Sequence, residues 1–202
     1  MQKNNKINIW TLAFTILYVI GFGIYYLITK NYEFLWYIFI MVVLILITIF
    51  LNKKFKFNSW ILFGMSVWGL MHMAGGSVRI VGTRLYDVIL ISLVNESVAG
   101  APIFRYDQLA HFYFYFIVTF LVYYILKDYI NKNANKFMVS VFLVFIGMGI
   151  GALNEIFEFV PVLLFGNTGV GDYFNTLWDI VFNTIGAIVA VIIINLTLKK
   201  RN

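Results

Sequence analysis

Asp107 and His111 lie four residues apart at the start of a long apolar run, and their types and spacing could support chemistry. Residues four apart in a helix lie on one face, one turn above the other. A carboxylate and an imidazole are costly to place in hydrocarbon unless they have partners or a purpose. The pair therefore predicts a functional site where this run begins.

Three more carboxylates lie in later apolar runs. Glu155 and Glu158 are three residues apart and share a helical face, and Asp179 lies in the first turns of the last run. Counting along the expected helices brings these side chains and His111 to a similar depth near one face of the membrane. We predict that one catalytic site contains Asp107, His111, Glu155, Glu158 and Asp179.

Two kinds of chemistry suit these residues. Carboxylates and an imidazole can hold a divalent metal ion, and the candidate ligands are Asp107, His111, Glu155 and Asp179. Alternatively, the carboxylates raise the basicity of His111, and the group exchanges protons. A structural alternative is a hydrogen-bonded polar plug that fixes the register of the helices. The residues leave all three interpretations open.

Six other residues are candidates for contacts with a substrate. The arginines near this face suit phosphate or carboxylate groups, which a guanidinium binds through two parallel hydrogen bonds. Alternatively, these arginines neutralise acidic residues of the loops or extend to the membrane interface. The candidates for substrate binding are Arg79, Arg84, Arg105, Asp87, Asn183 and His72.

The composition places these residues in a membrane protein. Of the 202 residues, 62% are hydrophobic and 12% are charged, which excludes a soluble globular domain. The chain has no cysteine and two histidines, so thiolate sites, disulfides and a three-histidine metal site are excluded. The net charge is +6, and the basic residues lie in short clusters between apolar runs. This distribution is typical of membrane topology, so we expect no nucleic-acid partner.

Six apolar runs predict an all-α bundle of six transmembrane helices, in a single polytopic domain that covers residues 1–202. Runs of about 20 residues can cross a hydrocarbon core of roughly 30 Å. Gly147 and Gly151 form a close-packing pattern, so we expect the fifth helix to be central, with its carboxylates turned inward. The expected helices cover residues 9–28, 34–51, 59–74, 107–126, 137–159 and 177–198.

The basic residues predict the orientation of the bundle. If the N-terminus is cytoplasmic, eleven of the 15 lysines and arginines fall in cytoplasmic segments and four fall outside. This distribution predicts that both ends are cytoplasmic and that the polar site lies near the outer face. The cytoplasmic residues are Lys3, Lys6, Lys53, Lys54, Lys56, Lys127, Lys132, Lys136, Lys199, Lys200 and Arg201, and the outer ones are Lys30, Arg79, Arg84 and Arg105.

Two outer connections are longer than a helix bundle needs. Residues 75–106 include an apolar piece, 88–94, which is too short to span. We expect this piece to lie along the membrane interface or to fold back over the bundle. Residues 160–176 contain a glycine-rich turn, so we expect a flexible loop there.

Five motifs occur in order along the chain: LMHMAGG at 70–76, RLYD at 84–87, RYDQLAHF at 105–112, GIGALNE at 149–155 and NTLWD at 175–179. Together they resemble the motifs of the YjdF-type bacterial inner-membrane proteins, a family without an established activity. The resemblance implies a multi-pass protein of the bacterial cytoplasmic membrane.

The pairs Asp107/His111 and Asn183/Gly186, with Glu155 and Asp179, also follow a looser pattern. It is similar to that of VanZ-like membrane proteins, which are associated with glycopeptide resistance. This chain departs from that pattern at Glu158, where those proteins often have glutamine, and in its loop at 79–87. These departures argue against a glycopeptide role.

The expected function is that of a membrane-embedded hydrolase or transferase that acts on a lipid or a lipid-linked envelope substrate. The alternatives are a proton-coupled transporter, a small-ligand binder and a structural envelope protein. The cytoplasmic halves of the expected helices have almost no polar residues, so they favour an enzyme or a one-sided binder over a transporter.

Overall fold

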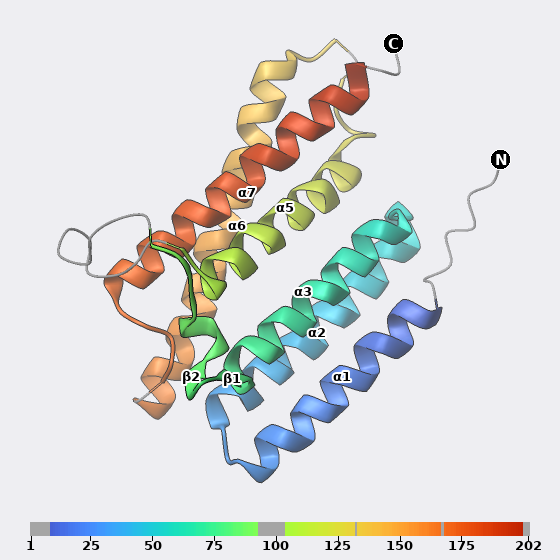
Figure 1. Cartoon of the computed structure of the whole chain (residues 1–202). Coiled ribbons are helices and arrows are strands. Elements are labelled where there is room, and N and C mark those ends of the chain that lie inside the picture. Colours follow the sequence, from blue (N-terminus) through green and yellow to red (C-terminus); the bar gives the residue numbers. More distant parts are fainter. Residues whose placement is uncertain (1–8, 93–103, 132, 167, 200–202) are drawn as a thin grey trace.

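The computed structural model describes residues 9–92, 104–131, 133–166 and 168–199, and six long helices dominate this part of the chain (Figure 1). One group of three packs side by side at one side of the molecule, and a second group packs at the other. The helices of the first group are α1 (Ile9–Ile28), α2 (Tyr32–Phe55) and α3 (Ser59–Ser77), and those of the second are α5 (Tyr106–Leu126), α6 (Lys136–Phe165) and α7 (Tyr173–Lys199).

Five of these helices are long and apolar enough to cross a membrane: α1, α2, α5, α6 and α7. The helix α3 has 19 residues but is not among them. Its sequence contains glycine, serine and histidine, which lower its hydropathy. The chain is therefore a helical membrane protein with several spans.

The helix α5 is the central one, and this corrects the expectation that α6 would be. In the apolar segment that is long enough to span a membrane, half of α5 is buried inside the protein, compared with 17% of α6. The most extensive packing is between α5 and α7, and α5 also contacts α3 and α6. At Gly186 of α7 a side chain would collide with the backbone carbonyl of Phe112, so the two helix backbones are in direct contact.

The glycines of α6 pack as their spacing predicts. A Cβ atom on Gly147 would lie 2.9 Å from the Cβ of Ala187, and one on Gly151 would lie 2.9 Å from Nδ2 of Asn183. Both positions therefore face α7. Although α6 is peripheral, this contact turns its carboxylate-bearing face inward.

The helix α6 ends at Phe165, six residues beyond the expected end, and it passes through Pro161. Proline lacks the N–H group that would bond to the carbonyl four residues earlier. That carbonyl belongs to Phe157, and it accepts a hydrogen bond from Nε1 of Trp36 on α2 at 3.3 Å. A side chain of another helix thus satisfies the carbonyl that the proline leaves free.

The helix α7 begins at Tyr173, four residues before the expected start. Asp172 acts as its N-cap, because Oδ1 of Asp172 accepts a hydrogen bond from the backbone N–H of Asn175 at 3.0 Å. The extra turn shortens the glycine-rich connection. It also adds Asn175 to the helical stripe that carries Asp179 and Asn183.

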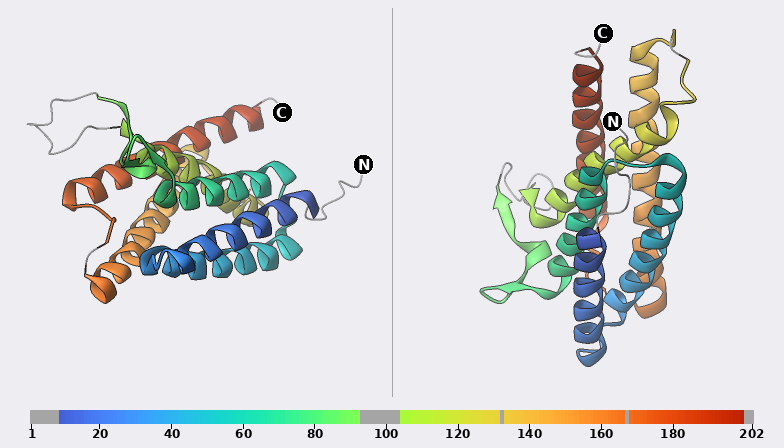
Figure 2. Two further views of the ribbon diagram at one scale, coloured as in Figure 1. Left: turned by 60° about the horizontal axis from the view of Figure 1, so that its bottom comes forward. Right: turned by 90° about the vertical axis from the view of Figure 1, so that its right-hand side faces the viewer.

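The connection between α3 and α5 contains short strands, so the described chain is not purely helical. Strands β1 (Arg79–Ile80) and β2 (Thr83–Arg84) form an antiparallel hairpin, followed by a 3-10 turn (Leu85–Asp87). Strand β3 (Ile89–Ile91) pairs with β4 (Phe104–Arg105) directly before α5. Figure 2 shows the strands on one side of the bundle, beside the N-terminal end of α5. The expected apolar piece 88–94 is thus partly a strand, and its last two residues lie outside the described ones.

The helix α1 begins and α7 ends on the side of the bundle away from β1 and β2 (Figure 1). Several residues that contribute to the charge asymmetry are outside the described part of the chain. They are Lys3, Lys6, Lys132, Lys200 and Arg201.

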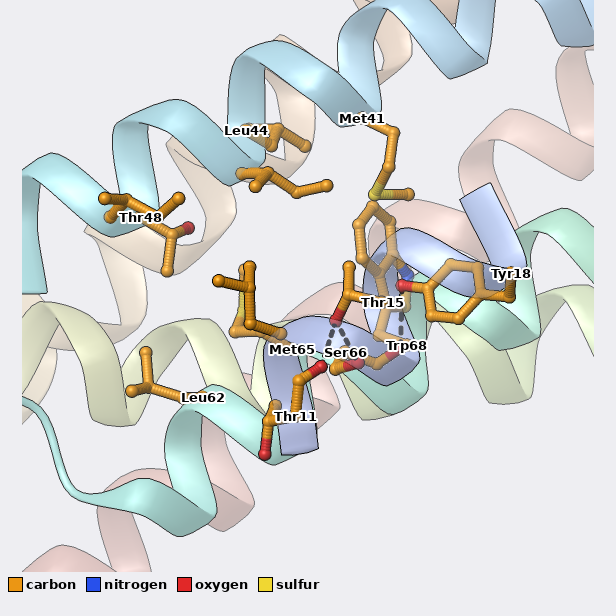
Figure 3. Close-up of a pocket in the computed structure, with 13 residues that line it drawn as sticks. Thr11, Thr15, Tyr18, Met41, Leu44, Thr48, Leu62, Met65, Ser66 and Trp68 are labelled. Atoms are coloured by element: carbon orange, nitrogen blue, oxygen red, sulfur yellow. Dashed lines mark hydrogen bonds between the residues drawn. The ribbon is translucent and has the colours of Figure 1, made fainter. Parts of the chain in front are cut away.

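A mostly apolar groove lies between α1, α2 and α3 (Figure 3). Its few polar groups bond to each other: the hydroxyls of Thr15 and Ser66 lie 2.6 Å apart, and the hydroxyl of Tyr18 donates to the carbonyl of Ser66 at 3.0 Å. Trp68 lines the groove and also stacks on Phe114 of α5 and on the ring of His72. One residue that lines the groove therefore also belongs to the contact between the two groups of helices.

Candidate functional site

His111 lies on the inner face of α5, and carboxylates from two helices surround it. Its Nε2 is 3.6 Å from Oδ1 of Asp107, one turn earlier on α5, and 3.9 Å from Oε1 of Glu158 on α6. Its Nδ1 is 3.8 Å from Oε1 of Glu155. Only 9% of the His111 side chain is exposed. The helical spacing seen in the sequence thus aligns these side chains on facing surfaces of α5 and α6.

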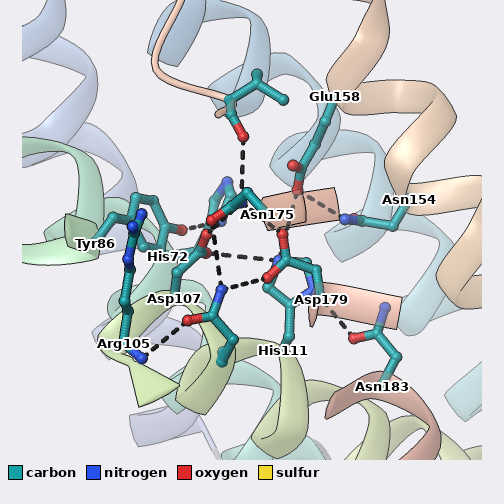
Figure 4. Close-up of polar contacts among 12 residues, drawn as sticks. His72, Tyr86, Arg105, Asp107, His111, Asn154, Glu158, Asn175, Asp179 and Asn183 are labelled. Carbon is teal, nitrogen blue, oxygen red and sulfur yellow. Dashed lines mark hydrogen bonds and ion pairs between the residues drawn. The ribbon is translucent and has the colours of Figure 1, made fainter. Parts of the chain in front are cut away.

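Asp179 on α7 completes the group through two amide side chains and is 1% exposed. Nε2 of Gln108 donates to its Oδ1 at 2.8 Å, and Nδ2 of Asn175 donates to its Oδ2 at 2.8 Å. Nδ2 of Asn175 also donates to Oδ2 of Asp107 at 3.2 Å. Figure 4 shows the side chains of Asp107, Asn175 and Asp179 pointing toward one another from different helices. The five predicted catalytic residues therefore lie together.

Asn183 fixes the orientation of the imidazole. Its Oδ1 lies 3.0 Å from Nδ1 of His111 (Figure 4). An amide oxygen only accepts hydrogen bonds, so Nδ1 of His111 carries a proton and donates it. Nε2 is then the nitrogen that faces the carboxylates of Asp107 and Glu158.

The site carries more negative than positive groups. In the described part of the chain, His111 is the only basic side chain that forms ion pairs within 4.0 Å with Asp107, Glu155 or Glu158. Two groups of three residues have the geometry of a metal site. In each group, every residue offers one ligand atom, and the three atoms lie within 4.8 Å of one another. The two triplets are Asp107, His111 and Asp179, and His111, Glu155 and Glu158. Both triplets suit a divalent cation, and both can also share protons.

Two buried polar atoms at this site have no hydrogen-bond partner. They are Oε1 of Glu155 and Nδ2 of Asn183. Nδ2 of Asn183 lies against Gly151 of α6, and Oε1 of Glu155 lies 3.8 Å from Nδ1 of His111.

Arg84 and Asp87 bind each other away from His111. Nε and one terminal nitrogen of Arg84 contact the two carboxylate oxygens of Asp87 at 3.0 and 3.1 Å. Burial lowers the pKa of Arg84, but the Asp87 carboxylate outweighs this effect, so the pKa is raised and the guanidinium stays charged. The guanidinium also donates to the carbonyl of Gly169 at 2.8 Å, and the N–H of Gly169 donates to Glu33 on α2 at 2.8 Å. Arg84 thus follows the alternative in which it neutralises a loop carboxylate.

Arg79 and Arg105 also lie apart from the imidazole. Arg79 lies in the exposed hairpin and donates to the carbonyl of Gly82 at 3.0 Å. Arg105 is the N-cap residue of α5, where its backbone N–H donates to Oε1 of Gln108 at 2.9 Å. Its buried Nε has no hydrogen-bond partner. Neither guanidinium forms an ion pair with the carboxylates of the site within the described residues.

His72 lies in an aromatic layer next to the site. Its Nδ1 is hydrogen-bonded to the hydroxyl of Tyr86 (Figure 4), and its ring stacks on Trp68. Burial raises the pKa of Tyr86 well above its usual value, so this hydroxyl keeps its proton. His72, Trp68 and Tyr86 line a small cavity together with His111 and Glu158.

Three amide residues of the site were not predicted from the sequence. They are Gln108, Asn175 and Asn154, the last of which donates to Oε1 of Glu158 at 2.7 Å. Asn154 lies four residues before Glu158, and Asn175 lies four residues before Asp179. The spacing that identified Asp107 and His111 would therefore have identified both pairs.

Comparison with known proteins agrees with the helical architecture. A family model described as "Predicted membrane protein (DUF2238)" matches residues 10–200. The YjdF-type proteins that the five motifs resemble form this same family. Neither a curated protein nor a solved structure matches the chain significantly. Because the match covers nearly the whole sequence, the chain belongs to the DUF2238 family of membrane proteins.

Proposed function

We propose that this protein is a membrane-embedded hydrolase or transferase that acts on a lipid or a lipid-linked envelope substrate. One observation carries the proposal: carboxylates from α5, α6 and α7 converge on the single imidazole of His111 in a buried position. Ionisable groups are expensive inside a membrane protein and mark functional sites by default. The residues that carry the chemistry are Asp107, His111, Glu155, Glu158 and Asp179.

The proposed chemistry is acid–base catalysis at a head group. A carboxylate beside the imidazole can take a proton from an attacking hydroxyl or water and return it to a leaving group. The neighbouring amides of Gln108, Asn154 and Asn175 hold three of the carboxylates in place. This supports a positioned catalytic group over a loose polar plug.

The groove between α1, α2 and α3 supports an amphiphilic substrate. Trp68 lines both this apolar groove and the small cavity that contains His111 and Glu158. A lipid whose acyl chain lies along the groove would therefore direct its head group toward His111. We infer that a substrate enters sideways from the bilayer.

We further propose that α3 crosses the membrane as a sixth span, with both chain ends in the cytoplasm and the site near the outer face. The basic residues favour this orientation, because cytoplasmic segments of membrane proteins are enriched in lysine and arginine. The resemblance to bacterial inner-membrane proteins favours the bacterial cytoplasmic membrane. A role like that of VanZ-like proteins is less favoured, because Glu158 departs from their pattern.

The catalytic proposal is tested with neutral variants of three site residues. Asp107→Asn, His111→Ala and Glu155→Gln should each abolish the change in lipid composition that expression of the protein causes, because they remove charge and proton affinity. Lipid mass spectrometry of cells with and without the protein supplies this readout. Melting temperatures in detergent should stay close to the wild-type value.

The matched control is Asp128→Asn, which neutralises an exposed carboxylate at the opposite end of α5. This variant should keep full function. If Asp107→Asn and Glu155→Gln also keep full function, the catalytic proposal is rejected. A structural plug would instead lower the melting temperature and the function together.

A further inference from the structure

We propose that Asp107, His111 and Asp179 bind a divalent metal ion through one carboxylate oxygen each and Nε2 of His111. These three residues offer ligand atoms that all lie within 4.8 Å of one another. Oδ1 of Asp107 is 3.6 Å from Nε2 of His111, which is too long for a hydrogen bond. Two ligands about 2.1 Å from a tetrahedral ion lie roughly 3.4 Å apart, so this separation suits two ligands of one ion.

The imidazole is oriented as a metal ligand requires. A histidine that binds a metal donates its other ring N–H to a protein acceptor, which fixes the ring and raises its basicity. Oδ1 of Asn183 supplies this acceptor for Nδ1 of His111 at 3.0 Å. The lone pair of Nε2 therefore faces the carboxylates. These acceptor groups repel one another, and a cation bound between them would attract all of them.

Both carboxylates are held from behind by amides. Gln108 and Asn175 donate to the two oxygens of Asp179 at 2.8 Å each, and Asn175 also reaches Oδ2 of Asp107. A carboxylate oxygen has two lone pairs, so these hydrogen bonds leave room for a metal–oxygen bond. Ligating carboxylates are generally hydrogen-bonded in this way.

Oε1 of Glu155 is an independent observation, because this buried atom has no hydrogen-bond partner. Oε1 of Glu155 lies 3.8 Å from the imidazole, and its side chain is 9% exposed. A water molecule bound to the ion would supply the donor that this oxygen lacks.

The other triplet, His111 with Glu155 and Glu158, is less suitable. Glu155 faces Nδ1, which is already engaged by Asn183. A site with two carboxylates and one imidazole suits Zn²⁺ or Mn²⁺ better than Ca²⁺, which takes about 6–8 oxygen ligands. We therefore assign the ion to Asp107, His111 and Asp179.

The test measures metal content without any substrate, so its outcome is independent of the proposed enzyme activity. Protein purified in detergent is stripped with a chelator and titrated with Zn²⁺ and, separately, Mn²⁺. Calorimetry and elemental mass spectrometry should give one ion per chain. Asp179→Asn and His111→Ala should lose this ion, and Asn183→Leu should weaken its binding about 10–100-fold, as loss of an orienting partner does.

Two variants serve as comparisons. Asp87→Asn removes a carboxylate that pairs with Arg84 and should bind the ion as the wild type does. Glu155→Gln should also retain it. Loss of the ion in Glu155→Gln with retention in Asp179→Asn would reject the assigned ligands in favour of the other triplet.

A measurement on the wild type tests the proposal even if the variants fail to fold. X-ray absorption of the Zn²⁺-loaded wild type should show oxygen and nitrogen ligands with a single imidazole. The ion should also raise the melting temperature, because it binds only the folded chain. If the wild type binds no ion, or binds it without imidazole, the proposal is wrong.

Discussion

The two nitrogens of His111 have different neighbours, and this difference determines what the residue can do. Nδ1 faces the amide oxygen of Asn183, whereas Nε2 faces the carboxylates of Asp107 and Glu158. The hydrogen bond at Nδ1 therefore orients the ring, and Nε2 is the nitrogen that faces the carboxylates. A proton or a cation at Nε2 would be stabilised by both carboxylates.

Asn175 is the residue that joins α5 to α7 at the site, and Asn175→Ala tests this role. The change removes hydrogen bonds to Asp107 and Asp179, so the partly buried carboxylate of Asp107 and the buried one of Asp179 lose the donor that they share. We expect the free energy of unfolding in detergent to fall by about 1–3 kcal/mol. Asn133→Ala, at an exposed loop position, should have no effect, and equal stability of both variants would contradict the role of Asn175.

Helical spacing predicted which charged residues of the site share a helix face, but it did not predict their contacts with distant segments. Helical periodicity aligned Asp107 with His111 and Glu155 with Glu158, because residues three or four apart share a face. It could not show that Arg84 binds the carbonyl of Gly169, because that contact joins segments 85 residues apart. The substrate-binding role of this arginine stays a prediction.

At the scale of the helices, close backbone contacts set the distance between the residues of the site. Gly186 lies against the carbonyl of Phe112, one residue after His111. Gly151 lies against Asn183, one turn before Glu155. The glycines therefore hold α5, α6 and α7 at the separation at which the ionisable side chains meet.

Gly186→Ala should disrupt this contact. The new methyl group would meet the Phe112 carbonyl, which cannot move without shifting α5. We expect a loss of about 1–3 kcal/mol in the free energy of unfolding, as overpacking causes. Gly149→Ala is the matched control, because no atom lies within 4 Å of a Cβ at that position. A stability loss of equal size in both variants would show that helical glycine content, not contact with α5, is responsible.

The six helices were predictable because apolar runs are long and separated by polar turns. Their ends were less predictable. A local rule places the end of α6 before Pro161, but Trp36, 121 residues earlier than Phe157, bonds to the freed carbonyl and the helix continues. The short strands before α5 were not predicted, since pairs of two or three residues leave no periodic signal.

At the scale of the molecule, the site lies at one end of the bundle, so the orientation determines from which compartment it is reached. Val81 is fully exposed at the tip of the β1–β2 hairpin, and Asn133 lies in the α5–α6 connection. The chain has no native cysteine, so single cysteines can be labelled without background.

We expect an impermeant thiol reagent added to intact cells to label Val81→Cys and to leave Asn133→Cys unlabelled. Both cysteines should react after the cells are opened, which controls for access to the thiol. The reverse pattern would place the site on the cytoplasmic side and overturn the proposed orientation.

The contact of Asp179 with Gln108 also has a consequence for biosynthesis. Translation produces α5 well before α7, so Gln108 and His111 enter the membrane before the residues that satisfy them have been made. The nascent bundle must keep these polar groups near water or the insertion machinery until α7 arrives. A chain interrupted before α7 would therefore leave Gln108 and His111 without these partners.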